Sequence, residues 1–360
     1  VAAVAGLVRR LKVQYPRHRI VCSVTTKTGY HLARTQLADV ALVIPSPLDL
    51  SGTVAAFTRV IRPVVYIAAE TELWPNLFRR LAKENVPIVI VNGRISDRSF
   101  GRYQAVQFFL KGALRDVRAF CMQSDTDAKR IRTLGADPAR VRVVGNIKFD
   151  DDGGGVAEMP RVFPADQQVW IAGSTHPGEE AIVLAVYRKM RDAGLPWCLV
   201  LAPRHVERSP EVMGCVRQAG FEGRTFSTLT PGSRLTAGEV LVVDTIGHLR
   251  GLYAQASLVF MGKSLRKGGG QNVIEPAFFA KAMIVGPMME NFRDILARFK
   301  EDCAIVQVKD DEEFSDAVLA LARDEGRRTV MGQKAAAVIA GNKGALERTL
   351  ACVREITGPS

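Results

Sequence analysis

Short runs rich in β-branched residues alternate with amphipathic helical segments along nearly all of the 360 residues. Such alternation predicts parallel sheets with helices on both faces, because each strand returns through a helix to lie beside the previous one. The predicted strands are 19–25, 40–44, 64–68, 88–91, 119–122 and 141–144 in the first half, and 169–173, 198–202, 239–243, 258–261, 282–285 and 304–308 in the second.

The two sets of strands are separated by residues 151–165, a polar, glycine-rich stretch without periodicity that we interpret as a linker. We therefore predict two Rossmann-like domains, at 1–150 and 166–325, with a cleft between them. Residues 326–360 are predicted to form a C-terminal helix, interrupted around Gly341, that packs back on the first domain.

The composition narrows the classes of partner and the cellular compartment. Lys and Arg number 49 against 37 Asp and Glu, and the net charge of +12 favours anionic partners. Nucleic acid is disfavoured, since no helix-turn-helix, zinc-ligand spacing or aromatic RNA-binding pattern is present. The six cysteines form no CxxC pair, which is typical of reduced core thiols in a cytoplasmic protein. No apolar run is long enough to span a bilayer, and no signal peptide is visible.

A glycine-rich loop after the strand at 258–261 is the first candidate binding element. Three consecutive glycines at 268–270 let the backbone approach a ligand closely, and a helix is predicted at 273–280 with Gln271 and Asn272 at its start. Such a helix start favours a phosphate. Glu275 in its first turn is placed to accept from ribose hydroxyls. The cations beside the loop are Lys263, Arg266 and Lys267. The alternative is a solvated surface loop.

Two further strand ends of the second half carry polar groups. Ser174, Thr175 and His176 follow one strand and open a helix, and Pro203, Arg204 and His205 end the next strand. In a parallel sheet these segments meet at one edge, where ligands bind. A structural role for either histidine remains the alternative.

The first half offers a comparable set of strand ends. Glu70 and Glu72, with a tryptophan and an asparagine after them, precede a helix and suit a polyhydroxylated substrate, although either carboxylate is also a candidate helix cap. Arg94 and Arg98 follow the next strand as candidate anion ligands, with surface arginines as the alternative. Lys148 follows the last strand.

These segments together resemble the Kdo transferases, glycosyltransferases that move 3-deoxy-D-manno-octulosonic acid (Kdo) from CMP-Kdo to a lipid A precursor. The resemblance runs nearly end to end, and the ordered pair ETELWPN and GGGQNVIEP makes it specific. The segments that carry it are ETELWPN at 70–76, NGRISDRS at 92–99, QSDTDAKRIRTLGA at 123–136, VVGNIKFD at 143–150, AGSTHPGEE at 172–180, APRH at 202–205 and KGGGQNVIEPA at 267–277.

The resemblance implies a GT-B fold, with CMP-Kdo held by the C-terminal domain and the lipid A precursor by the N-terminal domain. The resemblance further implies that the enzyme acts at the cytoplasmic face of the bacterial inner membrane, whose anionic surface is an expected partner. It also implies that the reaction needs no metal or other cofactor. We expect the CMP site to be lined by Ser174, Thr175, His176, Pro203, Arg204, Lys263, Gly269, Gly270, Asn272 and Glu275. The catalytic candidates are Glu70, Glu72, Arg94 and Lys148, with Arg94 or Lys148 holding the Kdo carboxylate.

One part of the family pattern is not found. The family's membrane-anchoring stretch, and its Ser-x-Gly-Glu segment with the glutamate assigned as general base, would precede Val1. The chain also starts without methionine inside a helical pattern, and we interpret it as truncated, with the first strand of the amino-terminal sheet missing. Two alternatives stay open: another GT-B nucleotide-sugar enzyme, such as a UDP-sugar transferase or epimerase, and a CMP-binding fragment without catalysis.

Overall fold

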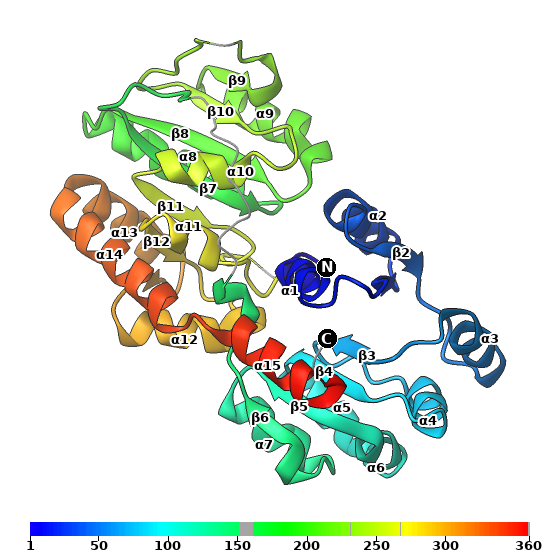
Figure 1. The fold of residues 1–360 in the computed structure, drawn as a ribbon. Helices are drawn as coiled ribbons and strands as arrows, with labels where there is room; N and C mark the ends of the chain where they lie inside the picture. Colours follow the sequence, from blue (N-terminus) through cyan, green and yellow to red (C-terminus); the bar gives the residue numbers. More distant parts are fainter. Residues whose placement is uncertain (151–160, 231, 267, 359–360) are drawn as a thin grey trace. The chain divides into compact units, whose positions relative to one another are not determined.

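The computed structural model describes residues 1–150, 161–230, 232–266 and 268–358. The chain divides into two compact units, unit 1 at Val1–Gly154 with Asn342–Ser360 and unit 2 at Gly155–Gly341 (Figure 1). Residues 151–160, most of the predicted linker, lie outside the described residues.

Unit 2 contains one seven-stranded parallel sheet in the order β13-β12-β11-β7-β8-β10-β9. The chain leaves β7 toward β8 on one side and later returns to place β11 on the other, so the order reverses at β7. Ligands of such sheets bind at the carboxyl ends of the strands beside this reversal. The elements are β7 (Gln168–Thr175), α8 (Glu179–Asp192), β8 (Trp197–Pro203), η3 (Val206–Arg208), α9 (Ser209–Gln218), β9 (Gly223–Thr225), η4 (Phe226–Thr228), β10 (Val240–Val242), α10 (Leu249–Gln255), β11 (Leu258–Met261), α11 (Ile274–Phe278), β12 (Ala282–Val285), η5 (Glu290–Phe292), α12 (Arg293–Glu301), β13 (Val306–Gln307), α13 (Asp311–Arg323) and α14 (Glu325–Gly341).

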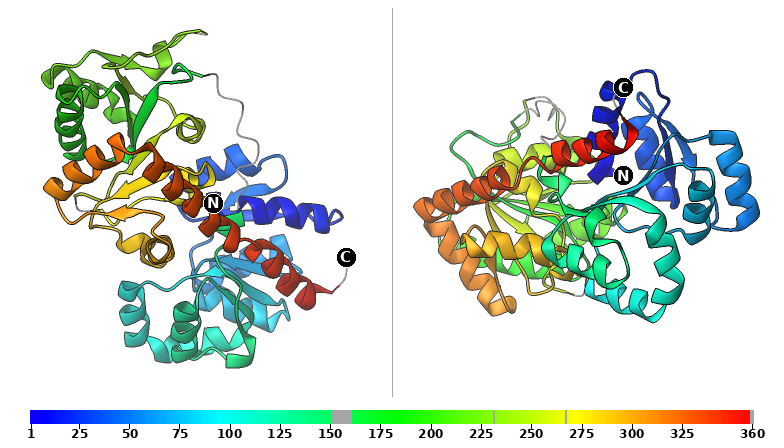
Figure 2. Two further views of the ribbon diagram at one scale, coloured as in Figure 1. Left: turned by 90° about the vertical axis from the view of Figure 1, so that its left-hand side faces the viewer. Right: turned by 60° about the horizontal axis from the view of Figure 1, so that its bottom comes forward.

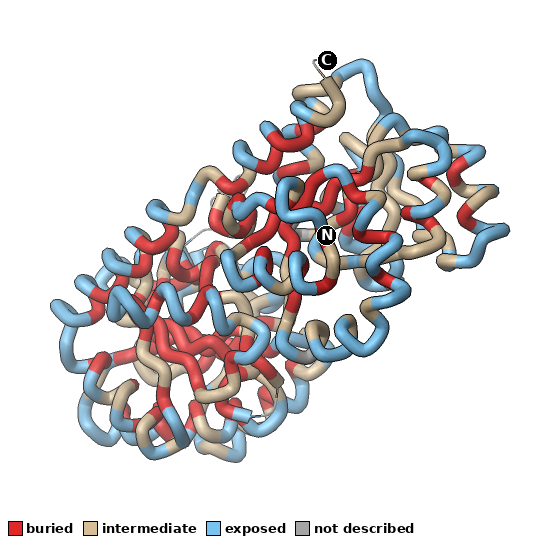
Figure 3. Tube along the Cα trace, turned by 90° about the horizontal axis from the view of Figure 1, so that it is seen from below, coloured by how far each residue is buried: buried red, intermediate tan, exposed pale blue. Residues whose placement is uncertain are grey.

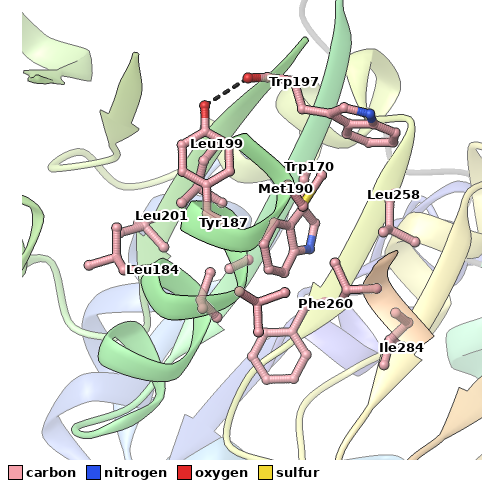
Figure 4. Packing of buried hydrophobic residues seen from close by; sticks show 14 of the residues in the cluster. Trp170, Leu184, Tyr187, Met190, Trp197, Leu199, Leu201, Leu258, Phe260 and Ile284 are labelled. Atoms are coloured by element: carbon pink, nitrogen blue, oxygen red, sulfur yellow. Dashed lines mark hydrogen bonds between the residues drawn. The ribbon is translucent and has the colours of Figure 1, made fainter. Parts of the chain in front are cut away.

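The core of unit 2 is built from large side chains of the central strands and α8. Trp170 of β7, Trp197 of β8 and Phe260 of β11 are almost fully buried around Tyr187 of α8 (Figure 4). The Tyr187 hydroxyl donates to the Trp197 carbonyl oxygen at 2.7 Å, which satisfies the buried phenol. Every residue of β8 and β11 is buried, as expected for parallel strands covered on both faces.

Unit 1 holds two parallel sheets, β1-β2 and β3-β4-β5-β6, rather than the single sheet that strand alternation predicts. Among the described residues no strand pairs with the free edge of β1 or of β3, so pairing does not continue from one sheet to the other. The elements are α1 (Ala2–Gln14), β1 (Val21–Val24), α2 (Lys27–Leu37), β2 (Leu42–Pro45), α3 (Ser51–Ile61), β3 (Tyr66–Ala69), α4 (Pro75–Lys83), β4 (Ile88–Gly93), α5 (Asp97–Ala105), α6 (Gln107–Asp116), β5 (Val117–Met122), α7 (Asp125–Thr133), η1 (Pro138–Arg140), β6 (Val141–Val143), η2 (Ile147–Asp150) and α15 (Ala345–Thr357).

The four-stranded sheet of unit 1 has a hydrophobic cluster on each face. Ile88 and Ile90 of β4 pack into one cluster, while Val89 and Val91 pack into the other. This split follows from the strand period of two. Helices α4, α6 and α7 supply the first cluster, and α1 and α15 the second. The ribbon views show α1 and α15 on the opposite face of this sheet from α6 and α7 (Figure 2). Buried residues follow the strands, and exposed residues follow the outer helical turns (Figure 3).

All twelve predicted strands are present, and β9 is an additional one. The helices predicted at 103–114 and 273–280 differ in the structure. A helix predicted at 103–114 is two helices, α5 and α6, because the chain turns at Val106. The interruption predicted around Gly341 is present, because α14 ends at Gly341 in unit 2 and α15 begins at Ala345 in unit 1. Helix α11 ends at Phe278, two residues early. Over the part of the chain that the structure describes, the helices are all too short or too polar to cross a membrane.

Candidate functional site

The loop after β11 is held against the start of α8 by one buried carboxylate. Oε1 of Glu179 accepts from the backbone N–H groups of Ser264 at 2.9 Å and Leu265 at 3.0 Å. Oε2 accepts from the N–H groups of Lys263 at 2.7 Å and His176 at 2.9 Å. Glu179 is fully buried, and four charge-assisted hydrogen bonds compensate its desolvation. This residue was not among those predicted from the sequence, where its position in the first turn of a helix is all that marks it.

Close backbone contacts explain the glycines of this loop. A Cβ at Gly262 would lie 2.6 Å from the carbonyl oxygen of Ser174, so β11 approaches β7 too closely for any side chain there. Gly269 and Gly270 both have φ of +83°, in the left-handed region. The Gly270 N–H donates to the Lys263 carbonyl oxygen at 2.8 Å, which folds the loop back on itself. Lys263, Gly269 and Gly270 therefore belong to one compact turn.

The ends of β7 and β8 bring two histidines and an arginine to the same edge. The rings of His176 and His205 lie 6.0 Å apart between centroids. The Arg204 N–H donates to the carbonyl oxygen of Thr175 at 3.0 Å, which joins the segment after Pro203 to the end of β7. Arg204 and His205 are exposed and face solvent. This edge therefore presents one guanidinium and two imidazoles beside the loop that carries Lys263.

Thr175 differs from the expectation that its hydroxyl meets the ligand. Its side chain is buried, and Oγ1 donates to Oε1 of Glu180 at 2.8 Å. Nη1 of Arg208 donates to the same carboxylate at 2.8 Å. Thr175 therefore offers the site its backbone, while Ser174, which has φ of +55°, remains partly exposed in the turn.

The surroundings of the His176 imidazole favour its neutral form. Burial lowers the pKa of His176 first, and the nearby positive charge of Lys263 lowers it further. Its Nε2 atom is buried and has no hydrogen-bond partner among the described residues. A buried polar atom without a partner is uncommon and calls for an explanation such as a missing ligand group. This ring nitrogen is a candidate contact for a bound phosphate.

Two predictions about the helix at 273–280 need correction. Val273 occupies the N-cap position, and the Asn272 Oδ1 atom instead accepts from the Ile274 N–H at 3.2 Å. Helix α11 has five residues, so its dipole contributes little to anion binding. Glu275 lies near the buried Tyr253 hydroxyl. Burial raises the pKa of Tyr253, and the negative charge of Glu275 raises it further.

The expected cationic run beside the glycine loop is smaller than predicted. Arg266 forms a bidentate ion pair with Asp311, with Nη–Oδ distances of 2.8 and 2.7 Å, and this pairing lowers the pKa of the Asp311 carboxyl. Asp311 therefore compensates the positive charge of Arg266 within unit 2. Lys267 lies outside the described residues. Of the three predicted cations, Lys263 is the one that the structure places beside His176.

In unit 1, the loop after β3 is fixed by a residue that was not predicted from the sequence. Asp49 caps α4, because its Oδ2 and Oδ1 atoms accept from the N–H groups of Asn76 at 3.1 Å and Leu77 at 2.9 Å. Capping by Glu70 or Glu72, the alternative for these carboxylates, is therefore wrong. Both glutamates are exposed, and Glu70 has φ of +59°.

The carboxyl ends of β3 and β4 are joined at this loop. The Thr71 hydroxyl donates to the Arg94 carbonyl oxygen, and the Glu72 carboxylate accepts from Nε1 of Trp74 at 3.3 Å. The Tyr103 hydroxyl donates to the Thr71 carbonyl oxygen at 3.1 Å. Burial raises the pKa of Tyr103, and the Glu72 charge raises it further. Glu72 and Arg94 therefore lie on neighbouring, mutually bonded loops.

Lys148 lies two strands further along this edge. Its N–H donates to Oδ1 of Asn146 at 3.0 Å, in the turn after β6. The preceding Ile147 N–H donates to Oδ1 of the buried Asn92 at 3.1 Å, which ties this turn to the end of β4. The unit 1 candidates thus share the carboxyl edge of one sheet. The described residues contain no group of three or more His, Cys, Asp or Glu side chains that would hold a metal ion.

Several known proteins are similar to this chain in sequence. A family model described as 3-deoxy-D-manno-octulosonic-acid transferase matches residues 1–151. A 3-deoxy-D-manno-octulosonic acid transferase of Haemophilus influenzae is 32% identical over 356 residues, which cover 97% of this chain and 83% of the relative. A bifunctional glycosyltransferase/methyltransferase of Fusobacterium nucleatum is 33% identical over 310 residues, covering 84% of this chain and 48% of that protein, so the chain spans about half of its length.

Solved structures extend the comparison to the fold. The UDP-GlcNAc 2-epimerase of Neisseria meningitidis superposes with a TM-score of 0.66 at 10% identity, over 98% of this chain and 96% of that one. This likeness shows the fold alone, two Rossmann-like units of the GT-B type. The identity and coverage of the Haemophilus relative decide the family. The chain belongs to the 3-deoxy-D-manno-octulosonic acid transferases, a family of glycosyltransferases.

Proposed function

We propose that the protein transfers Kdo from CMP-Kdo to a lipid A precursor at the cytoplasmic face of the inner membrane. The observation that carries the proposal is the edge of unit 2 where Lys263, His176 and Arg204 lie beside a glycine turn that Glu179 holds in place. Cations and backbone N–H groups are the partners that a phosphate requires.

The leaving group explains why these groups are placed together. Transfer breaks the bond between the anomeric carbon of Kdo and a CMP oxygen, so negative charge develops on the departing phosphate. Lys263 and Arg204 would stabilise that charge in the transition state, and the unpartnered Nε2 of His176 would contact the same phosphate. The charge of these residues supports transfer without a metal ion. Glu275 would accept from the ribose hydroxyls, and Asn272 would line the same side.

Unit 1 would hold the acceptor and the sugar. Arg94 and Lys148 are the candidate partners of the Kdo carboxylate, while Glu70 and Glu72 line the acceptor side. A general base is needed at the acceptor hydroxyl. Within the chain, Glu70 and Glu72 are the first candidates for this base.

The experiment first compares the binding of two nucleotides and then measures transfer of Kdo. Calorimetric titration should show binding of CMP and much weaker binding of UDP, which separates this proposal from a UDP-sugar transferase or epimerase of the same fold. Incubation with CMP-Kdo and a tetra-acylated lipid A precursor, with and without EDTA, should then release CMP and lengthen the lipid product. Preference for UDP would overturn the donor assignment, and loss of transfer in EDTA would overturn metal independence.

A further inference from the structure

Helix α6 of unit 1 exposes two adjacent phenylalanines. Phe108 is 87% exposed and Phe109 is 73% exposed, and their rings contact each other edge to face at 5.6 Å between centroids. Val106, at the start of the helix, is 45% exposed. Large apolar side chains gathered on one exposed turn mark an interaction surface more often than single exposed residues do.

The same face of α6 carries positive charge. Lys111 and Arg115 follow Phe108 at i+3 and i+7 and are exposed, so they lie along one side of the helix. The opposite side, with Leu110 and Leu114, is buried in the core of unit 1. We call Val106, Phe108, Phe109, Lys111 and Arg115 the α6 patch.

The charge around the α6 patch is mostly positive, and the nearest acidic residues in the chain are Asp97 and Asp116. Residues 98–115 contain four Lys or Arg and no Asp or Glu. Two copies of the α6 patch would therefore repel each other if they met face to face, which argues against self-association. An anionic bilayer offers the complementary chemistry, because aromatic rings enter the headgroup region while Lys and Arg contact lipid phosphates.

We propose that the α6 patch docks the protein on anionic lipid bilayers, with Phe108 and Phe109 inserted among the headgroups. The proposal rests on the proposed function in one respect, since a lipid acceptor places the reaction at a membrane. Helix α5 begins at Asp97, three residues after Arg94. Docking through α6 would thus bring the acceptor-side loops of unit 1 to the surface that holds the lipid.

Vesicle flotation tests the docking directly, without donor or acceptor sugar. The wild-type protein should float with phosphatidylcholine vesicles that contain phosphatidylglycerol, and bind pure phosphatidylcholine poorly. F108S/F109S should weaken binding by about 10- to 100-fold, from the lost insertion of two rings. K111Q/R115Q should weaken it by about 30-fold, because each cation near an anionic surface contributes about one kcal/mol.

Matched controls come from α14, where Val330 is exposed between Arg327 and Lys334. V330S and R327Q/K334Q should bind vesicles as the wild type does. Unchanged flotation of both α6 variants would overturn the proposal. So would an effect of the α14 variants as large as theirs. Loss of a dimer in sedimentation velocity, with flotation intact, would assign the patch to a second copy.

Two measurements separate insertion into the bilayer from misfolding and from effects on unit 2. In the conservative variant F108W, the fluorescence of the new indole should shift to the blue on vesicle binding and should be quenched by brominated lipids. Fluorescence that brominated lipids leave unchanged would contradict insertion. This test holds even if the serine variants misfold. CMP titration of every variant reports on unit 2. Vesicle binding with no CMP binding would refute the proposed function alone, whereas CMP binding without vesicle binding would refute the docking alone.

Discussion

The Ser264 backbone N–H donates to Oε1 of Glu179 at 2.9 Å, although 85 residues separate the two in the chain. This bond and its three companions place the loop after β11 beside the turn after β7. The geometry of the proposed phosphate site therefore depends on a carboxylate that faces away from solvent and acts as a positioning residue.

Glu179→Gln should destabilise unit 2 and weaken CMP binding together. The amide keeps the size of the side chain but replaces one acceptor oxygen by an NH₂ group, so two backbone N–H groups lose their acceptor. We expect the free energy of unfolding to fall by about 2–4 kcal/mol. Urea unfolding and calorimetry measure the two effects, with the exposed Glu207→Gln as control. Unaltered CMP affinity in the variant would separate the loop from the site.

The stability of unit 2 should depend on pH through His176. Its pKa is lower in the folded protein than its ordinary value of 6.5, so the unfolded chain takes up the proton first as the pH falls. The stabilising contribution of neutral His176 is fully present above pH 6.5. It is lost as the pH falls from 6.5 toward the pKa of His176 in the folded protein. Unfolding midpoints between pH 7.5 and 5 should fall less in His176→Gln than in the wild type. His31→Gln, at an exposed position of α2, should follow the wild type.

Donor and acceptor roles should separate between the two units. Glu275→Ala should weaken CMP binding by about 1–3 kcal/mol through the lost ribose acceptor, while Glu275→Gln, which keeps an oxygen, should lose less. Glu72→Ala should reduce transfer and leave CMP affinity unchanged. Equal loss of CMP affinity in the Glu72 and Glu275 variants, by calorimetry, would show that this division of labour is wrong.

Asp49→Ala should destabilise unit 1 through the start of α4. Removing a cap that accepts from two N–H groups costs about 1–2 kcal/mol, and the neighbouring loop with Glu72 should lose its fixed position, which lowers transfer. Glu84→Ala at the other end of α4 breaks an i,i+4 pair with Arg80 and should cost about 0.3–0.5 kcal/mol. Equal midpoints for the two variants in urea would contradict the capping role.

The alternating pattern was sufficient to predict the positions of twelve strands, since each is a short apolar run bounded by helical segments, but it did not predict that β1 and β2 form a separate sheet. It also located the loops that the structure brings to each sheet edge. The pattern did not predict Asp49 or Glu179, because each acts on N–H groups far away in the chain, 27 residues away in the case of Asn76. A carboxylate before or inside a first turn looks the same from the sequence whether it caps its own helix or holds another loop.

The side-chain roles that failed have the same origin. Arg266 sits within a basic run, but its partner Asp311 lies 45 residues later at the start of α13. The spacing of residues near Arg266 does not reveal that Asp311, rather than a phosphate, binds its guanidinium. Thr175 likewise follows a strand as a phosphate ligand would, yet its hydroxyl is taken by Glu180 within the fold.

The separation of β1-β2 from the larger sheet has a consequence for motion. Each of the two strands has four residues, none of them fully buried, whereas all six residues of β4 are buried. A two-stranded sheet has little stability of its own, so amide protons of β1 and β2 should exchange with solvent well before those of β4 and β5. Local opening would then begin at residues 21–45, and the rest of unit 1 would stay folded. The first part of the proposed acceptor unit would thus sample open states that its four-stranded sheet does not.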